Sequence, residues 1–170
     1  HPTAAEELNY LIHAGILEAD EKFNPDAAVT KEEALKVLLN SVTYMYFNSR
    51  LNEYETTNQS FTDITPDHAL YPFATRALRM GMLDASTKTF NATAPLTNQE
   101  LAKWVTGALK LNKAAQHSDI YDLKYSDAEQ VDKEFRGYVA LAYAMGLLEA
   151  ENNQLKPKSE VTYAQLAQVT

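Results

Sequence analysis

The chain has 170 residues, a net charge of −8 and a pI near 5.0. Hydrophobic residues make up 45% and charged residues 22%, which is typical of a folded globular protein and argues against disorder. The absence of cysteine excludes disulfides, thiolate nucleophiles and cysteine-based zinc sites. The acidic balance, with scattered lysines and arginines, argues against binding to nucleic acid or to an anionic membrane surface.

The first predicted element is an amphipathic helix that ends near Gly15. Its apolar residues recur at helical spacing and share one face: Ala4, Leu8, Leu11 and Ile12. Gly15 stands where helices commonly end in a left-handed residue. A helix of this kind, with one apolar face, needs a partner to pack against.

A second helix is predicted to begin at Thr30, after a loop that contains Phe23 and Pro25. Thr30 and Glu33 have the spacing of a capping box, in which each side chain accepts the backbone N–H of the other residue. Val29 precedes the box, as in a hydrophobic staple.

This helix–loop–helix pattern occurs three times. The glycines that end the first helices are 66 and 65 residues apart, at Gly15, Gly81 and Gly146. The loops continue with Phe90 and Pro95, or with Leu155 and Pro157, and the later boxes are Thr97 with Glu100 and Thr162 with Gln165. The sequence therefore predicts one domain, residues 1–170, of three repeats at about 1–47, 61–111 and 125–170, with connections at about 48–60 and 112–124.

An aromatic-x-Asp sequence opens the second and third predicted repeats. These sequences are Phe61-Thr62-Asp63 and Tyr125-Ser126-Asp127. Asp63 with Asp67 and His68 allows a metal-site interpretation, but turn chemistry around Thr65-Pro66-Asp67 is favoured. The acidic stretch at Asp119, Asp122, Asp127 and Asp132 does not match a calcium loop and is expected to be solvated surface. We expect no metal and no cofactor.

No catalytic motif is present. The chain has neither an HExxH nor a G-x-S-x-G sequence, so no catalytic residue is assigned. An enzyme domain stays open only because the absence of a motif is weak evidence, and a converging cluster of titratable groups would revive it. His1-Pro2 is an unusual native start, so the chain is expected to be an excised or mature segment.

The three segments resemble the S-layer homology (SLH) domain. That family has an aromatic-x-Asp opening, a first helix that ends in glycine, a loop with Phe and Pro, and a second helix that begins Thr-Arg-Ala-Glu. The resemblance implies an all-α fold in which three helix-loop-helix repeats form one pseudo-threefold unit with a central helix bundle. It also implies non-covalent binding of pyruvylated secondary cell-wall polysaccharide in grooves between the repeats.

The family's main contact for an anion is the arginine after the threonine, and this chain has no arginine there. The matching residues, and hence the expected ligand-binding residues, are Lys31, Asn98 and Tyr163. Of these only Lys31 is cationic, so it is the residue expected to hold an acidic group. The loops after the glycines are acidic, as at Glu18, Asp84 and Glu149, and they would repel an acidic sugar.

The resemblance predicts a non-catalytic module that anchors a larger exported protein to cell-wall polysaccharide, outside the cell, in the wall or S-layer of a bacterium. Its partners would be that polysaccharide and other domains of the parent protein, without nucleic acid or membrane insertion. The alternative is a degenerate domain with a structural or protein-interaction role and no glycan binding. The missing arginines and the charge of −8 favour this alternative.

Overall fold

The computed structural model describes the backbone of residues 2–45 and 61–170 and the side chains of 4–41 and 61–170. The predicted connection at 48–60 lies outside these ranges. The described helices are α1 (Pro2–His13), α2 (Lys31–Met45), α3 (Tyr71–Met80), α4 (Asn98–Ala108), α5 (Asn112–Ala115), α6 (Arg136–Ala144) and α7 (Tyr163–Ala167). The described residues form no sheet, only isolated β-bridges, which confirms the prediction of an all-α fold.

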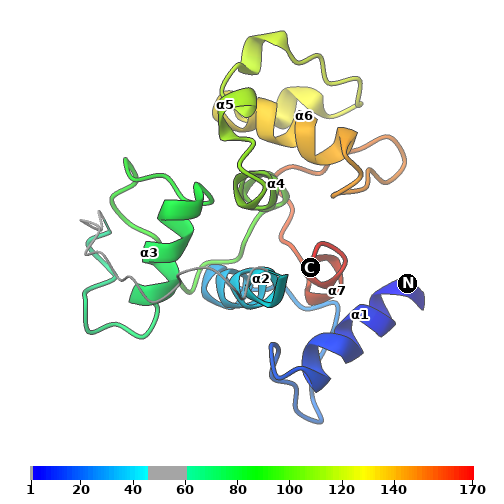
Figure 1. Ribbon diagram of the computed structural model, residues 1–170. Helices are drawn as coiled ribbons and strands as arrows, with labels where there is room; N and C mark the ends of the chain where they lie inside the picture. The colour runs from blue at the N-terminus through cyan, green and yellow to red at the C-terminus, as the bar shows by residue number, and fades with distance from the viewer. Residues whose placement is uncertain (1, 46–60) are drawn as a thin grey trace.

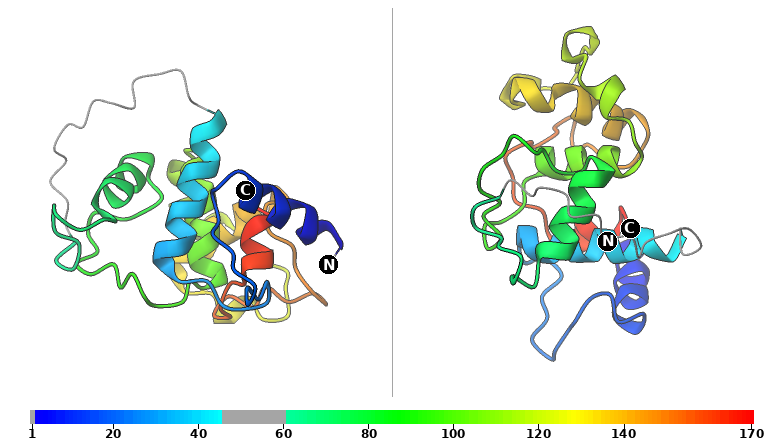
Figure 2. Two further views of the ribbon diagram at one scale, coloured as in Figure 1. Left: turned by 90° about the horizontal axis from the view of Figure 1, so that it is seen from below. Right: turned by 60° about the vertical axis from the view of Figure 1, so that its left-hand side comes forward.

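The second helices of the predicted repeats lie at the centre of the molecule. Figure 1 shows α2, α4 and α7 nearly end-on around the middle, with α1, α3 and α6 outside them. In the left view of Figure 2 the three central helices run side by side. Their buried faces belong to a hydrophobic cluster that includes Leu35, Leu39, Leu101 and Leu166.

The first helices end in left-handed glycines, as the sequence predicts. The φ angles are 67° at Gly15, 78° at Gly81 and 70° at Gly146. The N–H of the next residue donates back into the helix in the same way each time: Ile16 to Leu11, Met82 to Ala77 and Leu147 to Ala142, each at 2.9 Å. This bond turns the chain toward the following loop.

The predicted capping boxes are present at the starts of α2, α4 and α7. In each box the threonine N–H donates to the side chain three residues later, with distances of 3.0 Å (Thr30 to Glu33), 2.9 Å (Thr97 to Glu100) and 2.9 Å (Thr162 to Gln165). In the first two boxes the threonine hydroxyl also donates to the carboxylate, at 2.6 and 2.8 Å. A glutamine cannot accept in the same charge-assisted way.

A closed ring of backbone hydrogen bonds joins the residues that precede the three boxes. Val29 N–H donates to the Val161 carbonyl at 2.9 Å, Val161 N–H to Leu96 at 2.8 Å, and Leu96 N–H to Val29 at 3.0 Å. The side chains of all three residues are fully buried. The three apolar residues that precede the capping threonines therefore tie the three segments together.

The first N–H groups of α2, α4 and α7 donate to a loop from another predicted repeat. These groups have no partner within their own helix. Lys31 donates to Ala94, Asn98 to Ser159 and Tyr163 to Ala27, at 2.9, 3.0 and 3.3 Å. The next N–H of each helix donates to the carbonyls of Ala92, Pro157 and Pro25, respectively.

The positions of these acceptor carbonyls show that the three loops align differently from the sequence-based alignment of their prolines. The carbonyls of Pro25 and Pro157 are matched by that of Ala92, two residues after Phe90. Pro95, which the sequence analysis paired with the other prolines, instead forms a β-bridge with Thr30. Pro25 and Pro157 each stand two residues after the large apolar residue of their loop, whereas Pro95 stands five residues after Phe90.

The aromatic-x-Asp sequences hold the loops in place. The Asp63 carboxylate accepts the N–H groups of Phe90 and Asn91, at 2.9 and 2.8 Å. The Asp127 carboxylate accepts those of Leu155 and Lys156 in the same way, at 2.8 and 2.7 Å. His68, the other residue considered for a metal, accepts the N–H of Leu70 in a turn. These contacts support the interpretation as turn chemistry.

The predicted connection at 112–124 contains helical turns. It holds α5 and a 3-10 turn at Ser118–Ile120, and two more 3-10 turns, Ala128–Gln130 and Lys133–Phe135, precede α6. Gly137 allows α6 to approach this connection closely, since a Cβ there would lie 1.9 Å from the Ala115 carbonyl oxygen. The connection is therefore packed against α6.

Replacing the capping threonines is expected to destabilise the fold. Thr30→Ala and Thr97→Ala should each lower the free energy of unfolding by about 0.5–2 kcal/mol, because each removes an acceptor and a hydroxyl donor at a helix start. Thr162→Ala should cost less, because its box is exposed and uses a glutamine. Urea unfolding measures the three differences, and unchanged stability at both Thr30 and Thr97 would contradict the assignment.

Neutralising the loop-closing aspartates should also destabilise the fold. Asp127→Asn is expected to cost about 1.5–3 kcal/mol, because the Asp127 carboxylate is buried and accepts two N–H groups. Asp63→Asn should cost less, because that residue is exposed. Asp67→Asn is the matched control in an exposed turn and should leave the urea midpoint unchanged. Equal midpoints for Asp127→Asn and the control would disprove this role.

Candidate functional site

Lys31 lies at the contact between the first and second predicted repeats. It is the first residue of α2, and the bond from its N–H to Ala94 places it beside the start of α4. Its Nζ lies 2.6 Å from Oε1 of Glu100, and the two side chains are 17% and 23% exposed. Lys31 is therefore in a partly buried ion pair with the capping-box acid of the next repeat.

The Glu100 carboxylate serves two partners at once. One oxygen binds Lys31, and the other accepts the N–H and hydroxyl of Thr97, at 2.9 and 2.8 Å. Burial by itself raises the pKa of Glu100, but the hydrogen bonds from Lys31 and Thr97 outweigh it and hold the pKa below its ordinary value. Glu100 is thus ionised at neutral pH and competes with any anion for Lys31.

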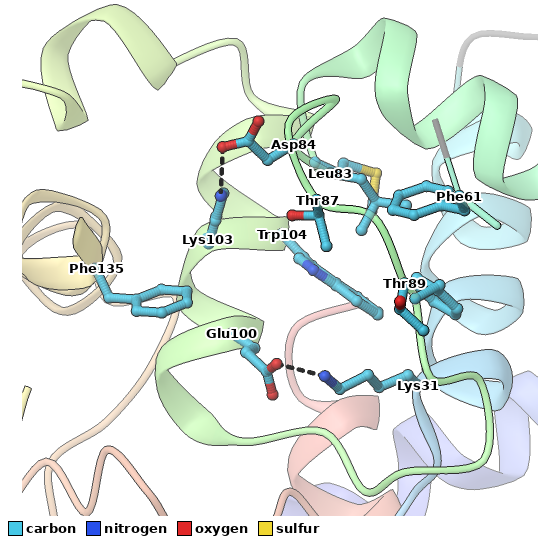
Figure 3. A pocket seen from close by; sticks show the side chains of 12 residues that line it. Lys31, Phe61, Leu83, Asp84, Thr87, Thr89, Glu100, Lys103, Trp104 and Phe135 are labelled. Atoms are coloured by element: carbon cyan, nitrogen blue, oxygen red, sulfur yellow. Dashed lines mark hydrogen bonds and ion pairs between the residues drawn. The ribbon is translucent and has the colours of Figure 1, made fainter. Parts of the chain in front are cut away.

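A pocket with a cavity volume of about 110 Å³ opens beside this ion pair. Figure 3 shows Lys31 and Glu100 at one end of the pocket and Lys103 and Asp84 at the other, with Trp104 between them. Trp104 is 5% exposed and stacks on Phe90 with ring centroids 6.1 Å apart. Trp104 is therefore buried, and its ring forms part of the pocket wall.

Lys103 is the second cation of the pocket. Its Nζ is 3.6 Å from the Asp84 carboxylate and lies over the rings of Phe135 and Tyr138, 5.8 and 5.6 Å from their centroids. The distance to Asp84 exceeds the 2.7–2.9 Å or so of a strong charge-assisted bond. The other oxygen of Asp84 accepts the N–H and hydroxyl of Ser86. The pocket thus contains two cations and two acids.

Asn98 occupies the position of Lys31 at the contact between the second and third predicted repeats. It is 9% exposed, and its Nδ2 donates to the Lys156 carbonyl at 2.9 Å. A different pocket lies here, lined by Asn98, Gln165 and nine other residues. The amide N–H group that could have served a ligand is already occupied by the main chain.

Tyr163 occupies the same position at the contact between the third and first predicted repeats. Its ring meets Phe23 edge to face, with centroids 5.1 Å apart. Burial, followed by the hydrogen bond to the Glu33 carboxylate and the charge of that group, raises the pKa of Tyr163 to about 12. The hydroxyl therefore stays protonated at neutral pH and acts as a donor.

The three residues expected from sequence do not converge on one site. Each contacts or faces the capping-box residue of another predicted repeat: Lys31 with Glu100, Asn98 with Gln165, and Tyr163 with Glu33. Lys103 was not predicted from the sequence, although it is one helical turn beyond Glu100 and thus on the same face of α4. Nothing local in the sequence indicates Phe135 as part of this pocket.

The described residues contain no group of three or more histidine or acidic side chains arranged to hold a metal ion. Among the same residues, no helix has the length and apolar character that crossing a membrane requires.

Comparison with models of known protein families gives a match over two segments of the chain. The model of the S-layer homology domain matches residues 1–35 and 124–167. Lys31 and Tyr163 lie within the matched segments, while Asn98 and most of the pocket beside Lys31 lie between them. No curated protein matches the chain.

The ion pair with Lys31 should be visible in the titration of Glu100. Lys31→Met removes the cation, so the Glu100 pKa should rise, since burial then acts against a weaker set of hydrogen bonds. The stability that Glu100 contributes is present above its unfolded pKa and is lost as pH falls through its lower folded pKa, so Lys31→Met should reduce this acid dependence. Carbon-13 NMR of the carboxyl groups measures the change.

Glu33 is the internal control for this titration. It caps α2 as Glu100 caps α4, but its contacts are with Thr30, Tyr163 and Lys36. Its pKa should stay the same in Lys31→Met. An unchanged Glu100 pKa would show that the ion pair does not persist in solution.

Proposed function

Because the chain carries an S-layer homology domain, we propose that it binds cell-wall polysaccharide non-covalently. Modules of this family are generally non-catalytic and anchor proteins at the cell surface. The protein so anchored would be a larger exported one, located in the wall or S-layer of a bacterium. The observation that carries the proposal is the pocket beside Lys31, which combines two lysines with aromatic walls. The acidic group of the polysaccharide, such as a pyruvyl carboxylate, is the part that we propose enters it.

The size of the pocket supports binding of a substituent rather than a sugar chain. Its volume of about 110 Å³ is far below the roughly 300–1,000 Å³ of sites that enclose a small molecule. A carboxylate would approach Lys31 or Lys103, and the rest of the sugar would remain outside. The ammonium group of Lys31 is already paired with the Glu100 carboxylate. Binding of the ligand would therefore replace that carboxylate with the one on the sugar.

The other two positions are proposed to contribute less. The Tyr163 hydroxyl is a protonated donor, but it already interacts with Glu33. The side-chain amide of Asn98 donates its N–H to the Lys156 carbonyl, which leaves its oxygen for a ligand. Neutral hydrogen bonds of this kind contribute about 0.5–1.5 kcal/mol, against about 1.5–3 kcal/mol for one to a charged group.

The domain organisation is part of the proposal. We infer one pseudo-threefold domain with repeats at about 1–47, 61–111 and 125–170. The ring through Val29, Leu96 and Val161 supports it, because each segment donates to one neighbour and accepts from the other. The matching glycine caps and capping boxes support it as well.

The alternative function is structural, without glycan binding. It is favoured by the ion pair that engages Lys31, by the burial of Asn98 and by the net charge of −8. In that case the pocket is a packing feature, and Lys31 and Glu100 hold two repeats together. Binding to purified wall fragments separates the two functions.

Lys31→Ala should weaken binding to acidic wall polysaccharide about tenfold or more, because it removes a charge-assisted bond. Glu100→Gln should strengthen binding, because an amide can keep the cap, as Gln165 does, while it releases Lys31. Lys31→Arg should bind at least as well as the unmodified chain. Calorimetric titration at low and moderate salt measures these affinities.

Lys36→Ala is the matched control, since Lys36 is a lysine of α2 that pairs with Glu32 and does not line the pocket. Its affinity should equal that of the unmodified chain. Equal affinities for Lys31→Ala and Lys36→Ala would contradict the assignment of Lys31. A folded chain that does not bind wall fragments would leave the structural alternative.

A further inference from the structure

A larger pocket lies at the contact between the second and third predicted repeats. Its cavity volume is about 290 Å³, near the lower end of the roughly 300–1,000 Å³ of small-molecule sites. It corresponds in position to the pocket beside Lys31, because Asn98, Gln165 and Gln168 replace Lys31, Glu100 and Lys103. Both lysines are thus replaced by amides.

The larger pocket is acidic, whereas the charges of the pocket beside Lys31 balance. None of its lining residues is a lysine, arginine or histidine, while Glu7 of α1 and Glu149 of the loop after α6 supply carboxylates. An acidic sugar would meet two negative charges here with no cation to offset them. A protonated amine would instead be attracted to both.

One oxygen of Glu7 is left without a partner. Glu7 Oε2 is buried and has no hydrogen-bond partner among the described residues. An unsatisfied buried acceptor is unfavourable, and more so when it carries charge. Glu7 also lines the pocket, so a ligand N–H there would give this carboxylate a donor that it lacks among the described residues.

The amides of the pocket suit hydroxyl groups. Gln165 accepts the Thr162 N–H through Oε1, and its Nε2 has no hydrogen-bond partner among the described residues. Gln168 is exposed at the same pocket. Side-chain amides both donate and accept, as sugar hydroxyls do, so an amine and hydroxyls on one ring would match the acids and amides together.

The ligand that fits is not a bare metal ion. Among the described residues no three acidic or histidine side chains gather here or elsewhere. Two carboxylates fall short of the six to eight or so oxygen ligands that calcium takes. An ammonium group needs fewer acceptors, because it has only three N–H donors.

We propose that this pocket binds an amino sugar with a free, protonated amine. The inference rests on the proposed function, in that the amino sugar would belong to a cell-wall polymer. The chain would then recognise two different groups: an acid beside Lys31, and an amine beside Glu7 and Glu149. N-acetylation of the amine removes its charge and so abolishes recognition at the second pocket.

The test uses the full chain and two probes of equal length, a tetrasaccharide of glucosamine and its N-acetylated counterpart. Calorimetric titration at pH 6 and moderate salt should show binding of the amine form only. The double variant Glu7→Gln/Glu149→Gln should weaken that binding about tenfold or more. Amide chemical shifts in a nitrogen-15 NMR spectrum should change at Leu148, Gln165 and Gln168.

The control variant, Glu18→Gln/Glu21→Gln, removes the same charge from an exposed loop outside this pocket. Its affinity should equal that of the unmodified chain, whereas an equal loss in both double variants would mean unspecific attraction and overturn the proposal. Equal binding of the two probes, or binding of neither, would also overturn it. Lys31→Ala should leave glucosamine binding intact, so failure of the acid site and failure of the amine site are distinguishable.

Discussion

The fold depends on the ring of backbone hydrogen bonds through Val29, Leu96 and Val161. These three residues are fully buried, so the N–H and carbonyl groups in the ring have no water to bond with. Breaking one bond would leave a buried donor and a buried acceptor unsatisfied at the centre of the molecule. The same segments also present carbonyls to the first N–H groups of α2, α4 and α7, so helix starts and repeat contacts form together.

This constraint determines where the candidate site residues lie. The residue after each capping threonine is the first of its helix, and its N–H is bound to a loop of another repeat. Its side chain therefore emerges beside the capping box that follows that loop. Lys31 and Tyr163 each meet a carboxylate there, whereas Asn98 shares a pocket with the amide of Gln165. One backbone geometry thus gives three chemically different contacts.

Much of the local structure could be predicted because its causes are local. The glycine caps, the capping boxes and the apolar faces each depend on residues within one or two helical turns. The ring and the Lys31–Glu100 pair could not be predicted, because their partners are 65 to 132 residues apart in sequence and depend on how the segments meet. The pairing of Pro95 with Pro25 and Pro157 was wrong for a different, local reason, because it matched residue type and not the distance from the preceding large apolar residue. Composition matched, but the equivalent backbone position holds Ala92.

The capping boxes with glutamate and with glutamine show that capping the helix does not require the negative charge of Glu100. Gln165 caps α7 with an amide, so a negative charge is not required to satisfy the threonine N–H. The charge of Glu100 therefore has its main consequence at Lys31, where it offsets a partly buried cation that would otherwise be costly. The pair lowers the cost of keeping Lys31 in place without a ligand, and it weakens attraction for an outside anion. An acidic ligand must then offer more than charge, and the aromatic walls around Trp104 and Phe135 are the surface on which it can do so.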